Sequence, residues 1–184
     1  MEFRVLGSVQ ALVAGQPVEL GQRLERCLLG LLLLELGNPV STDRLIDLLW
    51  DGDEPGRPRS ALQVHVSRLR KRLAEADAER YGFRLVTRGS AYVLEGDPAL
   101  VDVHRFRSEY QRAKDTTDPA TRSKVLGAAL ALWRGPALGE EALSAPGPGS
   151  APGWTSCCSR PPTCGSRRSW PRAGTRRCSP SWRS

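Results

Sequence analysis

Cationic and hydrogen-bonding residues are concentrated on one side of the stretch from Pro58 to Ala76. Apolar residues recur along it at i, i+4, i+7 and i+11, the repeat of an α-helix; they are Leu62, Val66, Leu69 and Leu73. The opposite side, at about 100° of rotation per residue, carries Ser60, Val64, Ser67, Arg68 and Lys71. Such a face suits the major groove of DNA, where small residues permit close approach and Arg or Lys reaches phosphates or guanine edges. A solvated basic face on an ordinary core helix is the alternative interpretation.

The charge of the chain is segregated along its length. The formal net charge is +7 over 184 residues, but all 20 Asp and Glu residues lie at or before Glu141. Seven of the 27 basic residues lie after it, so residues 1–141 hold 20 basic and 20 acidic residues. The basic character of the whole chain therefore comes from its C-terminal part and is not evidence for DNA binding. The informative clusters are the local ones at residues 57–72 and 84–88.

Several classes of protein are disfavoured by what the sequence lacks. The N-terminus has no basic segment followed by an apolar one, as a signal peptide would. The apolar run from Cys27 to Leu34 is too short to span a bilayer. No Walker A loop, G-x-G-x-x-G motif or catalytic constellation is present around His65 or His104. We therefore expect a cytoplasmic protein that is not an enzyme, needs no cofactor or metal, and has no disulfide framework.

The order of predicted elements is strands, helix, helix, basic helix and hairpin. Helices are expected at residues 22–36, 41–50 and 58–76, with Ser41 as an N-cap and Gly37-Asn38 as a helix stop. Strands are expected at residues 2–6, 8–13, 17–20, 83–87 and 91–95. The last two strands would form a β-hairpin around Arg88-Gly89-Ser90. This order predicts an α+β fold in which a β-wing follows a helix-turn-helix.

Three segments carry a resemblance to a known family: VSTDRLIDLLW, ALQVHVSRLRKRL and VTRGSAYVL. Together they resemble the OmpR-type winged-helix DNA-binding domain. The short N-terminal strands and the opening FRVLG make the chain similar to the actinobacterial antibiotic regulatory proteins, which activate secondary-metabolite gene clusters. The resemblance implies a winged helix at residues 1–97, with an N-terminal antiparallel sheet and a C-terminal wing hairpin.

The resemblance continues past the wing. Residues 101–114 and 119–133 are each expected to form an amphipathic helix. This pair resembles the first repeat of the TPR-like bacterial transcriptional activation domain that follows the winged helix in this family. Residues 98–139 are therefore expected to be the start of that domain, which looks truncated because the pattern of amphipathic helices stops near residue 140.

The C-terminal stretch at residues 140–184 changes composition abruptly. After Glu141 it has no Asp, Glu, Phe, Tyr, Ile, Val or Met and is rich in Pro, Gly, Ser and Arg, so it is expected to be disordered. Its four cysteines lack a C-x-x-C pair, which disfavours zinc. Its arginines would add sequence-independent affinity for phosphates. We hypothesise a reading-frame shift near Glu140; translation of the other frames of the gene should restore amphipathic helices, and their absence would refute it.

The resemblance also implies individual roles at the DNA. Arg68 and Lys71 are expected to reach base edges or nearby phosphates, and Val64 to meet a thymine methyl beside Ser67. Arg70 and Arg72 lie on the flanks of this helix face, and contacts with the DNA backbone or local ion pairs are expected for them. Near the helix N-terminus, phosphate contacts are expected for Arg59 and Ser60. The wing residue Arg88 matches the arginine that enters the minor groove, with a solvated turn residue as the alternative.

The expected function is sequence-specific transcriptional regulation, and the expected form of regulation is activation of antibiotic biosynthesis genes. The resemblance implies double-stranded DNA with direct-repeat promoter sites, RNA polymerase holoenzyme and a homodimer on DNA as partners, and no membrane. Two alternatives stay open at this point. The winged helix could serve as a protein–protein interaction module, or the chain could be a frameshifted product that binds DNA without activating transcription.

Overall fold

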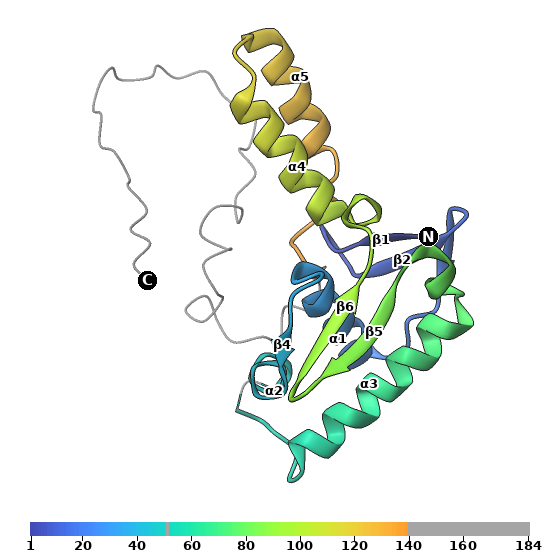
Figure 1. Ribbon diagram of the computed structural model, residues 1–184. Helices are drawn as coiled ribbons and strands as arrows, with labels where there is room; N and C mark the ends of the chain where they lie inside the picture. The colour runs from blue at the N-terminus through green and yellow to red at the C-terminus, as the bar shows by residue number, and fades with distance from the viewer. Residues whose placement is uncertain (51, 140–184) are drawn as a thin grey trace. The chain divides into compact units, whose positions relative to one another are not determined.

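The computed structural model describes residues 1–50 and 52–139, which form an α+β fold (Figure 1). The predicted disordered tail and the frameshift hypothesis lie outside the described residues. The described part contains two three-stranded antiparallel sheets, with strand orders β1-β2-β3 and β4-β6-β5. The predicted order of strands, helices, basic helix and hairpin is confirmed.

The N-terminal sheet is built from β1 (Glu2–Arg4), β2 (Gln10–Val13) and β3 (Gln16–Val18). A tight turn joins β2 to β3, with Gly15 at φ +80°, in the left-handed region that glycine adopts without strain. The first strand is shorter than the predicted 2–6. It ends at Arg4 because the amides of Val5 and Leu6 donate to the carboxylate of Asp102 instead of continuing the sheet.

The first helix, α1 (Arg23–Leu34), is mostly buried and lies centrally in the fold. After Gly37, the chain forms β4 (Val40–Ser41), a two-residue strand that the sequence did not indicate. The next helix is α2 (Thr42–Trp50). The expected cap is present, since the hydroxyl of Ser41 accepts a hydrogen bond from the amide of Arg44 at 3.2 Å.

The basic helix is α3 (Pro58–Glu75), one residue shorter than predicted, with Pro58 in its first turn. A short 3-10 turn, η1 (Ala78–Tyr81), leads into the hairpin of β5 (Arg84–Arg88) and β6 (Ala91–Glu95). The central strand of this sheet is β6, which pairs with β5 on one side and β4 on the other. The start of α2 and the wing are therefore held by the same sheet.

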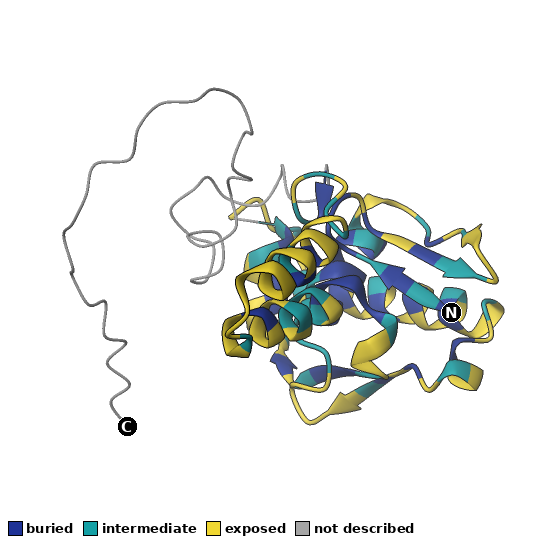
Figure 2. Ribbon diagram, turned by 90° about the horizontal axis from the view of Figure 1, so that it is seen from above, coloured by how far each residue is buried: buried dark blue, intermediate teal, exposed yellow. Residues whose placement is uncertain are grey.

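One apolar core joins both sheets and the first three helices. Figure 2 colours the buried residues dark blue along the ribbon, and they occur on these helices and on strands of both sheets. The rings of Phe3, in β1, and Phe83, the residue before β5, meet edge-on at 4.6 Å between centroids. The backbone approaches Phe83 closely at Gly96, where an added Cβ would lie 2.3 Å from the ring. A side chain at residue 96 would therefore disrupt this part of the core.

Two helices follow the wing after the 3-10 turn η2 (Pro98–Leu100). They are α4 (Asp102–Asp115) and α5 (Pro119–Leu130), which lie side by side in Figure 1. The second helix ends three residues before the predicted Trp133, because the amides of Leu132 and Trp133 bond carbonyls only three residues back. The ring of Trp133 still packs edge-on against Phe106 of α4.

The segment after α5 returns to the N-terminal strands. The amides of Arg134 and Leu138 donate to the carbonyls of Leu6 and Val5, both at 2.8 Å. Val101, Val103 and Leu138 belong to the same core as the winged helix. The predicted division at residue 97 therefore does not coincide with a break in the core, although the domain bounds themselves stay a prediction.

Asp102 is the buried polar residue on which this connection depends. Its carboxylate is 3% exposed and accepts hydrogen bonds from the amides of Val5 (2.8 Å) and Leu6 (3.1 Å) and from Arg134 Nη2 (3.1 Å). Three donors from two distant segments thus converge on one carboxylate. A buried carboxylate is tolerated when its oxygens are satisfied in this way.

We expect Asp102→Ala to lower the free energy of unfolding by about 3 kcal/mol, because it leaves buried donors without an acceptor. Urea denaturation of the full chain measures this. Asp53→Ala, at an exposed acidic residue, is the control and should change stability by less than about 0.5 kcal/mol. A similar small change for Asp102→Ala would contradict the role given to its carboxylate.

Candidate nucleic-acid interface

The two sides of α3 differ as the sequence predicted. Leu62, Val66, Leu69 and Leu73 are at most 4% exposed and face the core. The residues predicted for the opposite side are exposed: Ser60, Val64, Ser67, Arg68 and Lys71. Val64 is 48% exposed, which is unusual for a valine in this protein. The structure therefore presents a surface of cationic, small and hydroxyl side chains along one side of the helix, which we call the α3 face.

Arg70 connects α3 to the wing. Its Nε donates to the carbonyl of Leu85 at 2.9 Å, and its Nη2 donates to the hydroxyl of Thr87 at 2.7 Å. This arginine therefore ties α3 to β5. The contact with the DNA backbone or local ion pair that the sequence suggested for Arg70 stays a prediction, and within the protein its guanidinium bonds the wing.

The tip of the wing presents Arg88. The residue is the last of β5 and pairs with Ala91 across a turn in which Gly89 has φ +59°. Its side chain is 63% exposed, and its Nη2 lies 2.7 Å from Glu95 Oε1. Arg88 is thus placed at the hairpin tip, as expected, with an acidic partner on the neighbouring strand.

Other cations of the surface also have acidic neighbours. Arg59 pairs with Asp43 of α2 at 2.9 Å. Lys71 and Arg72 lie 3.9 Å and 3.5 Å from the carboxylate of Glu75. Such exposed ion pairs contribute little to stability, so these side chains can exchange a carboxylate for a phosphate at small energetic cost.

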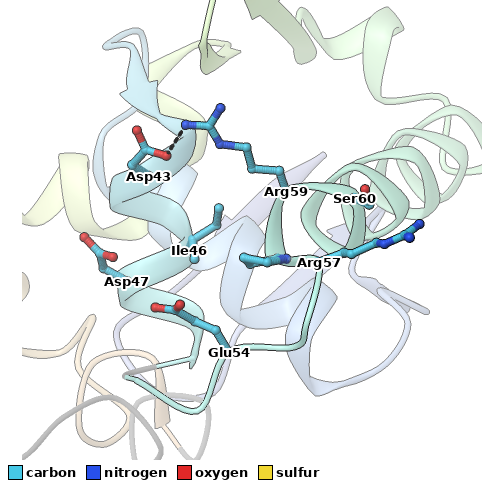
Figure 3. A pocket seen from close by; sticks show the side chains of 8 residues that line it. Asp43, Ile46, Asp47, Glu54, Arg57, Arg59 and Ser60 are labelled. Atoms are coloured by element: carbon cyan, nitrogen blue, oxygen red, sulfur yellow. Dashed lines mark hydrogen bonds and ion pairs between the residues drawn. The ribbon is translucent and has the colours of Figure 1, made fainter.

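A hollow of about 380 Å³ lies between α2 and the N-terminus of α3 (Figure 3). Its lining combines acidic residues of α2 and the following loop with Arg57, Arg59 and Ser60. In Figure 3, the Arg59–Asp43 pair lies at one edge of this hollow. Arg59 and Ser60 therefore sit at the N-terminal end of α3, where backbone amides without helical partners favour an anion.

Glu25 is a residue of the site that sequence reasoning missed. It lies in the first turn of α1, and its carboxylate is only 3% exposed. Its Oε1 lies 3.0 Å from His65 Nδ1 and 3.5 Å from Arg68 Nη1, both on α3. No local pattern could have revealed it, because its partners are 40 and 43 residues away.

The environment of Glu25 favours its ionised form. Burial alone would raise its pKa, but the hydrogen bond with His65, the hydrogen bond with the backbone amide of Glu25 itself and the contact with Arg68 together lower the pKa below its ordinary value. An anion is thus buried directly beneath the α3 face. Its stabilising effect is present above the ordinary carboxyl pKa and is lost as the pH falls through the lowered value.

Neither histidine belongs to a catalytic arrangement in the described part of the chain. His65 contacts Glu25, and its ring lies 6.1 Å from that of Trp50. His104 donates from Nε2 to the carbonyl of Leu33 at 2.8 Å, and burial lowers its pKa. Among residues 1–50 and 52–139, no cluster of three or more His, Cys, Asp or Glu could hold a metal ion. No helix there is long and apolar enough to cross a membrane.

Comparison with known proteins assigns both halves of the described part to families. Residues 15–94 match the family "Transcriptional regulatory protein, C terminal", and residues 101–149 match "Bacterial transcriptional activator domain". The second match extends ten residues beyond the predicted end at 139. The two matches confirm the predicted combination of an OmpR-type DNA-binding domain with a bacterial transcriptional activator domain. The relatives found by the comparison are named as transcriptional regulators.

These relatives are longer proteins. The transcriptional regulator RedD of Streptomyces coelicolor is 36% identical over 143 residues, which are 75% of this chain and 40% of RedD. The regulatory protein MoaR1 of Mycobacterium tuberculosis is 30% identical over 76% of this chain and 46% of its own length. The solved structure of Mycobacterium tuberculosis EmbR with a low-affinity phosphopeptide superposes with a TM-score of 0.69 at 30% identity, covering 78% of this chain and 38% of EmbR. The chain thus spans less than half the length of these relatives.

We expect Arg70→Ala to loosen the wing from α3, because it removes both side-chain bonds to β5. Amide hydrogen exchange at residues 84–88 should become faster by a factor of about 10, which corresponds to about 1.4 kcal/mol. Lys71→Ala is the matched control, since this exposed neighbour pairs with Glu75 of its own helix, and it should leave the exchange rates unchanged. Equal rates in both variants would exclude Arg70 as the link.

Proposed function

We propose that the chain is a sequence-specific DNA-binding transcriptional regulator. In this proposal α3 enters the major groove and the wing tip at residues 88–90 contacts the adjacent minor groove. The observation that carries it is the exposed α3 face, with Val64, Ser67, Arg68 and Lys71 on the side opposite a fully buried apolar stripe. The two family matches support it, because one family is described as a transcriptional regulatory protein and the other as a transcriptional activator domain.

The proposed roles divide the cations into three groups. Arg68 reads a base edge, close to Val64 and Ser67, whereas Lys71 and Arg72 contact phosphates. Arg59 and Ser60 hold a phosphate at the N-terminus of α3. Arg88 leaves Glu95 to enter the minor groove, and Arg70 acts by positioning the wing.

The further partners follow from family resemblance. We propose direct-repeat promoter sites bound by a pair of chains, contact with RNA polymerase holoenzyme, and genes of antibiotic biosynthesis as targets. A regulator of this kind acts on the bacterial chromosome, so the proposed location is the cytoplasm. The name of RedD, a transcriptional regulator, is consistent with this proposal.

The proposed function is tested by selection from random duplex DNA. The full chain is incubated with the library in excess competitor DNA, so that sequence-independent attraction to phosphates does not determine what is retained. Enrichment of one short motif, repeated about one helical turn apart, is the expected result. A retained pool without any enriched motif would contradict sequence-specific binding and favour a protein partner for the winged helix.

Arg68→Ala should weaken binding to the selected site by about 1–3 kcal/mol and relax the preference at one base position. Lys71→Ala should weaken binding to all sequences evenly and reduce the slope of log K against log salt by about 1, because it removes a phosphate contact. Titrations on the selected site and its single-base variants at several salt concentrations distinguish the two. Unchanged base preference in Arg68→Ala would show that α3 does not read the groove through this residue.

A further inference from the structure

The buried carboxylate of Glu25 is the feature of the molecule that the fold itself explains least. Two acidic residues are buried in the described part of the chain, Glu25 and Asp102. Asp102 receives three hydrogen bonds and has an evident structural role. In Glu25, the contacts with the side chains of His65 and Arg68 both fall on Oε1, and Oε2 is buried without a hydrogen-bond partner. An incompletely satisfied buried carboxylate is destabilising, so its presence points to another role.

Both partners of Glu25 lie on the helix of the DNA face. His65 and Arg68 are one turn apart on α3, so their side chains leave the helix on neighbouring positions of one side. His65 is 13% exposed and lies between Glu25 and the ring of Trp50. Arg68 is 57% exposed. Glu25 therefore contacts a packed residue and the proposed base-reading residue at the same time.

The contact with Glu25 involves one nitrogen of Arg68. A guanidinium is planar and carries five N–H donors in a fixed arrangement. When Nη1 faces Glu25 Oε1 at 3.5 Å, the donors on Nη2 and Nε stay available for a base edge or a phosphate. The plane of the group is then restricted before DNA arrives, and a restricted side chain loses less conformational entropy on binding.

We propose that Glu25 is a positioning residue for DNA recognition: its buried carboxylate orients the guanidinium of Arg68 toward one base pair. This inference rests on the proposed function. It assigns sequence discrimination partly to α1, a helix that does not itself belong to the α3 face. Glu25 acts through Arg68 and has no contact with DNA of its own.

The test is Glu25→Gln in the full chain, which keeps the size of the side chain and removes its charge. Binding is measured to the selected site, to that site with the Arg68-dependent base pair changed, and to random duplex. We expect the affinity ratio between the first two sites to fall about 3- to 10-fold, with binding to random duplex unchanged or tighter. In the double variant with Arg68→Ala, the ratio should equal that of Arg68→Ala alone, because the two residues act as one unit.

Glu75→Gln is the matched control. It also removes one negative charge beside cations of α3, but it does not contact Arg68. It should tighten binding to all three DNAs equally and leave the ratio unchanged. If Glu25→Gln behaves in the same way, Glu25 merely competes with DNA for Arg68 and the inference is overturned. If the wild-type chain bound the selected site, its variant and random duplex equally well, the proposed function would be overturned, and the inference with it.

A second measurement does not depend on a variant at residue 25. Rotation of the Arg68 guanidinium about its Nε–Cζ bond can be followed by ¹⁵N NMR in the free wild-type chain, with Arg68→Lys used to identify the signal. We expect slower rotation for Arg68 than for the exposed Arg84 of β5, whose ion pair lies on the surface. Equal rotation rates would show that Glu25 does not orient the group and would overturn the inference.

Discussion

Burial of the apolar stripe of α3 is the interaction on which the arrangement of the interface depends. Leu62, Val66, Leu69 and Leu73 pack into the core beneath α1 and α2. Burying each such side chain contributes roughly 1.5–3 kcal/mol, whereas an exposed ion pair contributes about 0–1 kcal/mol. The rotation of α3 about its axis is therefore set by its apolar side. The cations face outward as a consequence and have no part in setting it.

The wing is held in place by contacts from three directions. Its strand β6 lies between β5 and β4, and β4 leads directly into α2. The amide and the hydroxyl of Thr42 both donate to the carbonyl of Ser90, at 2.8 Å, and Arg70 joins the other strand to α3. The helix-turn-helix and the hairpin tip consequently form one unit, so the surface proposed to bind DNA is already assembled in the free protein.

Asp102 connects the helical pair to the N-terminal segment of the chain. Its carboxylate lies at the start of α4, yet it accepts hydrogen bonds from the two residues that follow β1 and from an arginine that follows α5. His104 adds a bond from α4 to the end of α1. The helical pair and the winged helix therefore share polar contacts as well as a core, and a displacement of one would disturb buried donors of the other.

Local sequence determined the elements and the two sides of α3, because a helix period, a capping residue and a turn glycine act over fewer than ten residues. Tertiary structure decided what depends on residues far apart. The two-residue strand β4 exists only because β6 pairs with it, and β1 ends early because Asp102, 97 residues away from Val5, captures its amides. The bonds from Arg70 to the wing and the contact of the buried Glu25 with Arg68 could not be predicted from the sequence for the same reason. A side chain's partner across the core leaves no periodic trace in the sequence, so only the folded chain shows which charge lies next to which.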